Sequence, residues 1–304
     1  MSKPRVGFLG LGIMGSGMAR RLLANGFPLA VYNRNSKKAE GFTESGARVA
    51  ANPREAAAGA DVVVCMVADD NASRAMWLGE NGALAGAAPG TICIDSSTVS
   101  VGWARELAKA AEAKKCEFLD TPVTGSKNQA AAGELNFLVG GEPTTLEKAR
   151  PVLAAMSKSI THIGPVGSGA LIKLINNFVC GVQIIAIAEA VAMIERSGLD
   201  RARALEVLTQ GAPGSPLVKA VSARMTAADY TPNFLLRLMA KDLKYSLEEA
   251  DKLSLHLTTA AAALETFQKA MAAGYGEKDI AAAVELLRAS TGTKKHDNES
   301  RRDG

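Results

Sequence analysis

The first half of the chain alternates short apolar runs with segments of helical character. The runs at 62–67 and 92–95 are apolar throughout, as expected for strands that are buried on both faces of a sheet. Further strands are predicted at RVGFLG, PLAVYN, EFLDTPV and NFLVGG, with helices such as MARRLLANG and SVGWARELAKAAEAKK between them. This alternation predicts an α/β fold over residues 1–165, with a doubly wound parallel sheet and helices on both of its faces.

The pattern changes near residue 165, where strand signals stop and helical periodicity takes over up to residue 289. Residues 170–196 contain no proline and one internal glycine, Gly181, and they predict a helix about 40 Å long at 1.5 Å per residue. This helix is apolar on nearly every side, so it is expected to be buried between other helices or against another subunit. We therefore predict an all-α domain at 166–290, joined through this long interdomain helix, and a homodimer or homotetramer built on the C-terminal helices. The polar residues 291–304 are predicted to be a disordered tail.

Composition excludes several classes of protein. The hydrophobic share of 47% and the charged share of 22% are those of a soluble globular chain, and 304 residues favour two domains. A net charge of +4, with no long basic run apart from the polar tail, gives only a weak electrostatic footprint for nucleic acid. The most hydrophobic stretch, 178–194, is about long enough to cross a membrane, but Gln183 and Glu189 interrupt it, which favours a buried helix and no membrane contact.

The cysteines and the start of the chain favour a cytoplasmic protein. Cys65, Cys93, Cys116 and Cys180 lie far apart without CxxC spacing, as is typical of buried thiols in a reducing cytosol. The chain enters an apolar strand within about five residues, which leaves no room for a signal peptide. The three histidines stand outside every motif, which argues against Ser-His-Asp hydrolysis or a histidine-based dehydrogenase, and no metal is required.

A glycine pattern follows the first predicted strand directly. Gly10, Gly12 and Gly15 have GxGxxG spacing, and these glycines together with Ile13 and Met14 are the predicted cofactor-binding residues of the loop. In such a loop the first glycine allows a tight turn, the second lets the backbone approach a pyrophosphate, and the third allows close helix packing. The strand before it and the helix after it supply the context that this motif needs. We therefore expect a Rossmann dinucleotide-binding domain, with the pyrophosphate at the start of the helix.

The end of the second predicted strand carries Asn33 and Arg34, about 20 residues after the glycines, where the residue that selects the ribose is expected. An acid there would accept a hydrogen bond from the 2′-hydroxyl. Arg34 instead offers a planar fork of donors that can pair with a 2′-phosphate and stack on the adenine. The pair predicts NADP(H) rather than NAD(H). The alternative is that Arg34 is a solvated loop charge.

Three further stretches resemble one enzyme family when they are taken with GLGIMG. They are FLDTPVTGSKNQAAAGELNFLVGG at 118–141, GPVGSGALIKLINN at 164–177 and LMAKDLKYSLEEA at 238–250. Together they resemble the β-hydroxyacid dehydrogenases, which include 3-hydroxyisobutyrate dehydrogenases and the reductases of tartronate semialdehyde, glyoxylate and succinic semialdehyde. The resemblance extends over roughly residues 4–289, with four motifs in the same order.

The resemblance implies that Lys173, in GSGALIKLINN, is the catalytic lysine that transfers the proton. Asn177 lies four residues later, and an i, i+4 pair shares one helix face, so both side chains can address the same substrate oxygen. The neighbours of Lys173 are apolar, which argues against a solvated surface lysine. A buried lysine needs a partner or a lowered pKa, and a lowered pKa suits an acid or base.

The segment DTPVTGS corresponds to the family's DxPVSGG stretch, which binds the substrate carboxylate. It gives Thr124, Gly125 and Ser126 as substrate-binding residues, whose hydroxyl and backbone N–H groups can form an anion site. The sequence departs from the SGG form and is more similar to the SGSKxxAxxGxL variant of the glyoxylate and succinic semialdehyde reductases. Thr124 in place of serine leaves the pocket size open, and a simple turn is the alternative reading of these residue types.

The resemblance also implies cofactor contacts outside the glycine loop. Lys241, in the KDL stretch, is expected to reach the cofactor, with Asp242 as its local partner, unless the two form a plain surface ion pair. Thr98, in DSST, would lie beside the nicotinamide, and Met66 and Val67 near the ribose. Strand ends often carry small or apolar residues without any ligand, which is the alternative for these three positions.

The sequence thus predicts an NADPH-dependent reductase of small aldehyde acids such as glyoxylate and succinic semialdehyde. A dehydrogenase of the 3-hydroxyisobutyrate or tartronate semialdehyde type is the near alternative. An imine reductase shares the architecture but usually lacks the lysine, and a non-catalytic dinucleotide-binding protein would be expected to lose it. Lys173 therefore favours carbonyl reduction.

Overall fold

The computed structural model describes residues 2–289, so the predicted tail at 291–304 lies outside the described residues. The chain divides into two compact units, Met1–Ile175 and Asn176–Gly304. The division falls inside one continuous helix, α9 (Ser168–Ser197), which confirms the long helix predicted at 170–196. The sequence places the boundary ten residues earlier, at 165/166. Each unit is described by itself.

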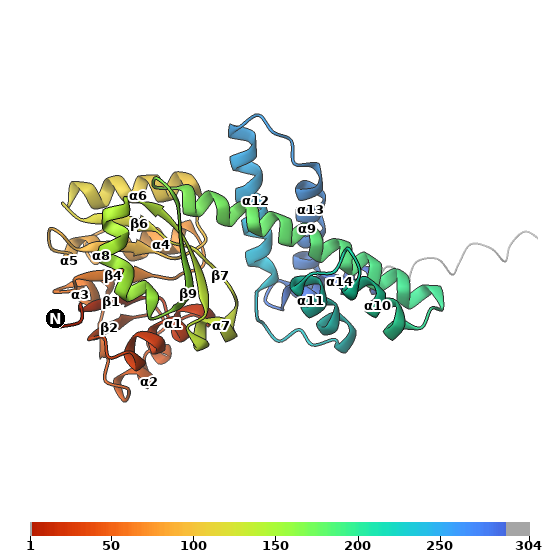
Figure 1. Ribbon diagram of the computed structural model, residues 1–304, viewed down its shortest axis with the longest axis horizontal. Coiled ribbons are helices and arrows are strands. Elements are labelled where there is room, and N and C mark those ends of the chain that lie inside the picture. Colours follow the sequence, from red (N-terminus) through yellow and green to blue (C-terminus); the bar gives the residue numbers. More distant parts are fainter. Residues whose placement is uncertain (1, 290–304) are drawn as a thin grey trace, which may run out of the picture. The chain divides into compact units, whose positions relative to one another are not determined.

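The first unit is built on one sheet (Figure 1), whose strand order is β3-β2-β1-β4-β5-β6-β8-β7, with β9 paired to β8. Leu9 lies opposite both Tyr32 and Cys65, Cys65 opposite Asp95, and Asp95 opposite Asp120. These residues end their strands, so the segments that follow them meet at one edge of the sheet. The strands are β1 (Val6–Leu9), β2 (Leu29–Tyr32), β3 (Arg48–Val49), β4 (Val62–Cys65), β5 (Ile92–Asp95), β6 (Glu117–Asp120), β7 (Val123–Thr124), β8 (Leu135–Gly141) and β9 (Ser157–Gly164).

Helices pack against the sheet, and the α/β fold with a Rossmann-type sheet is confirmed. Strands β1, β4 and β5 are buried at every position, as strands covered on both faces must be. The core includes Phe8, Val31, Val64, Ile94 and Phe137. The helices of this unit are α1 (Ile13–Ala24), the 3-10 turn η1 (Ser36–Lys38), α2 (Glu40–Thr43), α3 (Pro53–Ala57), α4 (Asp70–Trp77), α5 (Ala83–Gly86), α6 (Val101–Ala113), α7 (Lys127–Ala132) and α8 (Pro143–Ala154).

The sheet departs from the sequence prediction at β6–β9. Strands β6 and β7 both pair with β8 in antiparallel fashion, whereas the alternating pattern predicts parallel neighbours. Only the short helix α7 separates β7 from β8, which is less than a parallel crossover requires. Strand β9 was not predicted, because its sequence SKSITHIG is polar and mostly exposed and so gives no apolar run. It is an edge strand paired only with β8.

The regular secondary structure of the second unit is helical within its described residues, as predicted, apart from one isolated β-bridge between Leu235 and Asp279. Its core gathers apolar side chains of α9 and of the helices that follow, among them Ile184, Val191, Leu243 and Phe267. Gly181 lets α9 and α12 pack closely, since a Cβ there would lie 3.1 Å from the side chain of Leu243 on α12. The other helices are α10 (Arg201–Gln210), α11 (Pro216–Ala227), α12 (Leu236–Lys252), α13 (Thr258–Ala270), η2 (Met271–Tyr275), η3 (Ile280–Ala283) and α14 (Val284–Ala289).

Helix α9 is long and apolar enough to span a membrane by length and composition alone. Half of its most hydrophobic window is already buried inside the structure, and several of its residues belong to the core of the second unit. Core helices of globular proteins pass the same test, so this feature is weak evidence for a membrane segment.

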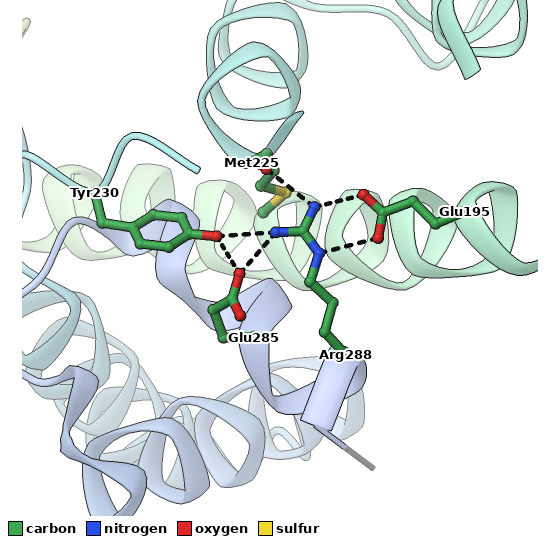
Figure 2. Close-up of polar contacts among 5 residues, drawn as sticks. All are labelled: Glu195, Met225, Tyr230, Glu285 and Arg288. Carbon is green, nitrogen blue, oxygen red and sulfur yellow. Dashed lines mark hydrogen bonds and ion pairs between the residues drawn. The ribbon is translucent and has the colours of Figure 1, made fainter. Parts of the chain in front are cut away.

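Hydrogen bonds of Arg288 on α14 link this helix to α9 and α11 in the second unit (Figure 2). Its guanidinium donates to both carboxylate oxygens of Glu195 on α9 and, at 3.0 Å, to the carbonyl oxygen of Met225 on α11. It also donates to Glu285 at 2.7 Å and to the hydroxyl of Tyr230 at 3.0 Å, while that hydroxyl donates to Glu285. Burial, followed by the Glu285 carboxylate, raises the pKa of Tyr230. The guanidinium thus makes five hydrogen bonds, one from Nε and two from each terminal nitrogen, which equals its number of N–H donors.

We expect Arg288→Met to lower the free energy of unfolding by about 1–3 kcal/mol, because it leaves Glu195 and Glu285 without their shared cation in a half-buried site. The matched control is Lys269→Met, which removes an exposed pair with Glu265 on α13 and should change stability by less than about 0.5 kcal/mol. Urea unfolding followed by circular dichroism measures both variants. Equal effects of the two substitutions would contradict a structural role for Arg288.

Candidate active site

The glycine loop between β1 and α1 is a close backbone turn. Gly10 has φ +97°, and a Cβ there would lie 2.3 Å from the carbonyl oxygen of Met66. A Cβ on Gly15 would lie 1.9 Å from the carbonyl oxygen of Gly10. The first and third glycines of the motif are therefore required by the fold itself, whatever the loop binds.

Gly12 differs from the other two glycines, because a Cβ built on it meets nothing within 4 Å. Its φ of −76° is one that any residue can adopt. Gly12 is also the N-cap of α1, where no side chain caps the helix and no acid lies in the first turn. The unpaired N–H groups of a helix start and the open space beside them fit a pyrophosphate group, so the residues present fit a dinucleotide.

Asn33 holds the glycine loop in place. Its Oδ1 accepts a hydrogen bond from the backbone N–H of Leu11 at 2.8 Å, and its Nδ2 donates to the carbonyl oxygen of Asn35 at 2.9 Å. The amide thus links the end of β2 to the loop that follows β1. The structure shows that Asn33 shapes the loop, and its predicted place at the ribose stays a prediction.

Arg34 lines a pocket of about 320 Å³ at the end of β2. The side chain is exposed, and no salt bridge to an acid is found for it within residues 2–289. A guanidinium that is not committed to a carboxylate can pair with a phosphate. The pocket is formed by Tyr32, Asn33, Arg34, Ser36, Ala39, Val49, Ala50 and Ala51.

The segments after β4 and β5 are tied together by hydrogen bonds. The backbone N–H of Val67 donates to Oγ of Ser97 at 2.9 Å, and the backbone N–H of Ser97 donates to the buried carboxylate of Asp95 at 2.9 Å. Asp95 also accepts from Nε1 of Trp77 at 3.0 Å. Burial raises the pKa of this carboxyl, although these hydrogen bonds oppose the rise. The network fixes the segment that carries Thr98, the residue assigned to the nicotinamide.

The loop at 124–126 is shaped by its own side chains. The hydroxyl of Thr124 accepts a hydrogen bond from Nδ2 of Asn136 at 3.3 Å, which leaves its O–H free of that bond. Gly125 has φ +118° and lies against Leu135. Both the backbone N–H and the hydroxyl of Ser126 donate to Oε1 of Gln129, at 3.0 and 2.6 Å. Ser126 would therefore have to exchange Gln129 for a substrate in order to bind it.

Helix α7, which follows this loop, packs on α1, which follows the glycine loop. Gly17 on α1 makes the approach possible, since a Cβ there would lie 2.9 Å from the backbone of Ala130. The substrate loop and the cofactor loop predicted from the sequence are thus joined through two helices in direct contact.

The start of α9 is held by a carboxylate that the sequence analysis did not assign. Asp120, the last residue of β6, is fully buried and accepts hydrogen bonds from the backbone N–H groups of Gly167 and Ala170, both at 2.8 Å. Burial raises the pKa of this carboxyl to about 6, against the lowering effect of the two amides. A Cβ on Gly169 would lie 2.9 Å from the same carboxylate, which explains one glycine of the GSG pattern.

Lys173 follows one turn later on α9 and is half-buried. Its place on the first turns of the helix is the one that the motif predicted. Asn177, four residues further along, is buried and is oriented by two side chains. Its Nδ2 donates to Oδ2 of Asp242 at 2.6 Å, and its Oδ1 accepts from Asn176 at 2.9 Å.

Lys241 and Asp242 form an ion pair at 2.9 Å on α12, as the sequence analysis expected. The pair is not a plain surface one, because the side chain of Lys241 is only 14% exposed and that of Asp242 only 1%. The ammonium group also lies 5.1 Å from the ring centre of Tyr245. Asp242 therefore orients both Asn177 and Lys241 within the second unit. Their contacts with substrate and cofactor stay predictions.

Asp95, Asp120 and Ser97 are functional candidates that sequence reasoning missed as such. Their signal is present, since each lies at or just after a strand end on the edge where the cofactor motif also lies. Partners 47 and 50 residues away, as for Asp120, cannot be read from local spacing. In residues 2–289 no group of three or more His, Cys, Asp or Glu side chains is arranged to hold a metal ion.

Fold and site together define an NAD(P)-dependent oxidoreductase of the hydroxyacid dehydrogenase type. The family model for the NAD-binding domain of 6-phosphogluconate dehydrogenase matches residues 5–164. The model for the NAD-binding domain of NADP-dependent 3-hydroxyisobutyrate dehydrogenase matches residues 167–287. The chain belongs to the β-hydroxyacid dehydrogenase family, as its motifs indicated.

Individual relatives span nearly the whole chain. A chloroplastic glyoxylate/succinic semialdehyde reductase of Arabidopsis thaliana is 35% identical over 94% of this chain and 80% of its own length. An NAD-dependent L-serine dehydrogenase of Pseudomonas aeruginosa is 34% identical over 93% of this chain and 97% of its own. The structure of Mycobacterium tuberculosis 3-hydroxyisobutyrate dehydrogenase with L-serine is similar at a TM-score of 0.85 and 34% identity, covering 94% of this chain and all of that one.

The two glycines Gly12 and Gly15 give a direct test of the cofactor loop. We expect Gly12→Ala to fold with an unchanged melting temperature and to bind NADPH at least about tenfold more weakly, because the added methyl fills open space at the start of α1. Gly15→Ala should instead lower the melting temperature, since its Cβ would collide with the carbonyl oxygen of Gly10. Fluorescence titration and differential scanning calorimetry measure the two effects. Wild-type NADPH affinity in Gly12→Ala would contradict the assignment of the loop.

Proposed function

We propose that this protein is an NADPH-dependent reductase that converts small aldehyde acids, such as glyoxylate and succinic semialdehyde, into hydroxy acids. One arrangement carries the proposal. The loop at 124–126 is joined to the cofactor helix through α7, and β6, from which that loop emerges, holds the start of the helix that bears Lys173. The loop proposed to bind the carboxylate, the dinucleotide loop and the proposed proton donor therefore all belong to the first unit.

The choice of NADP(H) rests on Arg34 and its pocket. Arg34 and the hydroxyl-bearing Ser36 both line this pocket, and no acid is among the pocket residues. Arg34 could pair with a 2′-phosphate there, whereas a ribose 2′-hydroxyl would find no carboxylate to accept its hydrogen bond. The relative of Pseudomonas aeruginosa is NAD-dependent by name, so the family as a whole does not decide the question.

The substrate class rests on the loop sequence TGSKNQAAAGEL and on its contacts. Thr124 can donate its O–H to a carboxylate, and the N–H of Gly125 lies on a turn with positive φ beside it. Glyoxylate and succinic semialdehyde differ in chain length, and one methylene in a pocket changes binding by only about 1–3 kcal/mol. A second candidate is a β-hydroxy acid substrate, as in 3-hydroxyisobutyrate or tartronate semialdehyde dehydrogenases, because two of the relatives carry L-serine in their names.

A dinucleotide held by the glycine loop would supply the hydride that reduces the carbonyl carbon. Lys173, as an ammonium ion, donates a proton to the carbonyl oxygen as negative charge develops on it. In the opposite direction neutral Lys173 accepts the hydroxyl proton. Thr124 and Gly125 hold the carboxylate, which orients the carbonyl, and Thr98 lies on the segment that Ser97 fixes. Asn177 is assigned to the same oxygen as Lys173.

The activity is tested by the initial rates of NADPH and NADH oxidation with glyoxylate and succinic semialdehyde. Methylglyoxal, which carries no carboxylate, serves as the control substrate. We expect turnover of both acids with NADPH, and a loss of at least about 100-fold in kcat for Lys173→Ala with unchanged NADPH affinity. Lys244→Ala, which removes an exposed lysine of α12, should retain full activity. Tight NADPH binding without turnover of either acid would contradict the proposal and favour an imine substrate or a non-catalytic role.

The cofactor preference is tested with Arg34→Asp. We expect kcat/KM for NADPH to fall by about 10- to 100-fold, because a charge-assisted pair is replaced by repulsion of the 2′-phosphate. The value for NADH should stay the same or rise. Arg150→Asp on α8 changes the net charge by the same amount at an exposed position and is the matched control. An unchanged ratio of NADPH to NADH in Arg34→Asp would show that the residue is a solvated loop charge.

We also propose a cytoplasmic homodimer or homotetramer that binds neither nucleic acid nor a membrane. Helix α9 and its neighbour α10 leave large apolar side chains exposed, with Met193 at 75% and Val207 at 71%, and such surfaces are typical of subunit contacts. The four free cysteines agree with a reducing compartment. Light scattering at micromolar concentration is expected to give two or four times the chain mass of 31.6 kDa. A monomeric mass would refute the assembly.

A further inference from the structure

The carboxylate of Asp120 is completely buried and takes no part in the proposed reaction. Its hydrogen-bond partners are backbone amides at the start of α9, and no salt bridge to it is found among the residues that the structure describes. Placing a charge-bearing group where no cation compensates it is expensive. Burial of this carboxylate lowers stability unless its hydrogen bonds offset the loss of hydration. Its position between the substrate loop and the helix that bears Lys173 suggests what those hydrogen bonds do.

We propose that Asp120 is a positioning residue that sets the place of Lys173 relative to the substrate loop. The inference rests on the proposed role of Lys173 as the proton donor. Asp120 ends β6 and stands four residues before Thr124, so it belongs to the segment that carries the substrate loop. Its two oxygens accept from Gly167 and Ala170, the latter three residues before Lys173. Through this one carboxylate, the chain segment that carries the substrate loop is hydrogen-bonded to the start of α9.

The surrounding glycines show that this contact is close and specific. A Cβ on Gly140 would lie 2.4 Å from Oδ1 of Asp120, and a Cβ on Gly169 would lie 2.4 Å from the carbonyl oxygen of Leu138. Strand β8 and helix α9 thus approach the end of β6 without side chains between them. Gly167, with φ +93°, lets the chain turn so that its N–H points at the carboxylate.

The chemistry of the contact calls for a carboxylate. Two N–H donors meet two acceptor oxygens, and an ionised aspartate is acceptor-only on both. Asparagine would keep one of these bonds and turn an NH₂ group toward the other N–H. Because Lys173 follows Ala170 by about 4.5 Å of helix rise, a tilt or shift of the first turn moves the ammonium group directly. A misplacement of about 1 Å can cost about 100-fold in rate.

The test compares Asp120→Asn and Asp120→Ala with Asp200→Ala. Asp200 is the matched control, because its carboxylate also accepts a backbone N–H at a helix start, from Arg203 on α10, outside the assigned site. We expect kcat with the preferred aldehyde acid to fall by about 10- to 100-fold in Asp120→Asn and further in Asp120→Ala. The NADPH dissociation constant should stay within about twofold, and Asp200→Ala should keep the wild-type kcat. If Asp120→Ala does not fold, Asp120→Asn decides.

A double-mutant cycle separates positioning from a general loss of structure. Since Asp120 acts through Lys173, Asp120→Asn should cause no further loss in the residual rate of Lys173→Ala. Additive losses, or equal losses in kcat and NADPH affinity, would overturn the proposal.

The proposal can be checked even if the wild-type protein reduces none of the aldehyde acids, an outcome that would refute the proposed function alone. Amide hydrogen exchange then decides. Faster exchange confined to residues 167–173 in Asp120→Asn supports the anchoring of α9 by this carboxylate, and unchanged exchange there overturns it.

Discussion

The site depends on the close approach of backbone segments to one another at the carboxyl edge of the sheet. Gly10 approaches the carbonyl of Met66, Gly15 that of Gly10, and Gly17 the backbone of α7. At each point a single methyl group would force the elements apart. The loops that carry the assigned cofactor and substrate residues keep their places because no side chain fits between them, and polar side chains such as Asn33 then complete the backbone hydrogen bonds that these turns leave open.

This constraint explains which parts of the molecule could be predicted from the sequence. The glycine spacing, the apolar strands β4 and β5 and the long helix α9 are local patterns, and each was predicted close to its observed position. Strand β9 was missed because an exposed edge strand buries little apolar surface and so leaves no hydrophobic signature. The antiparallel pairing of β8 was missed because strand direction depends on the connection between elements, which periodicity does not report.

The site shows the same division. Lys173 and Asn177 could be assigned from one motif because four residues of helix bring them to one face. The partners of these residues could not, since Asp242 is 65 residues from Asn177 and Asp120 about 50 from the amides that it binds. Ser126 illustrates a further limit. Its residue type and position suggest a substrate donor, whereas the fold commits both of its donors to Gln129, three residues later at the start of α7.

The Arg288 cluster has a consequence for how the chain reaches this structure during synthesis. Glu195 is made 93 residues before its partner, which at about 5–20 residues per second means a delay of about 5–20 s. Throughout that interval the C-terminal part of α9 exists with its apolar core side uncovered by the last helices, while the first unit already has all of its strands. The nascent chain is therefore most prone to aggregate while the helical unit is being synthesised. We expect chaperones to be needed most between the completion of β9 and the emergence of α14.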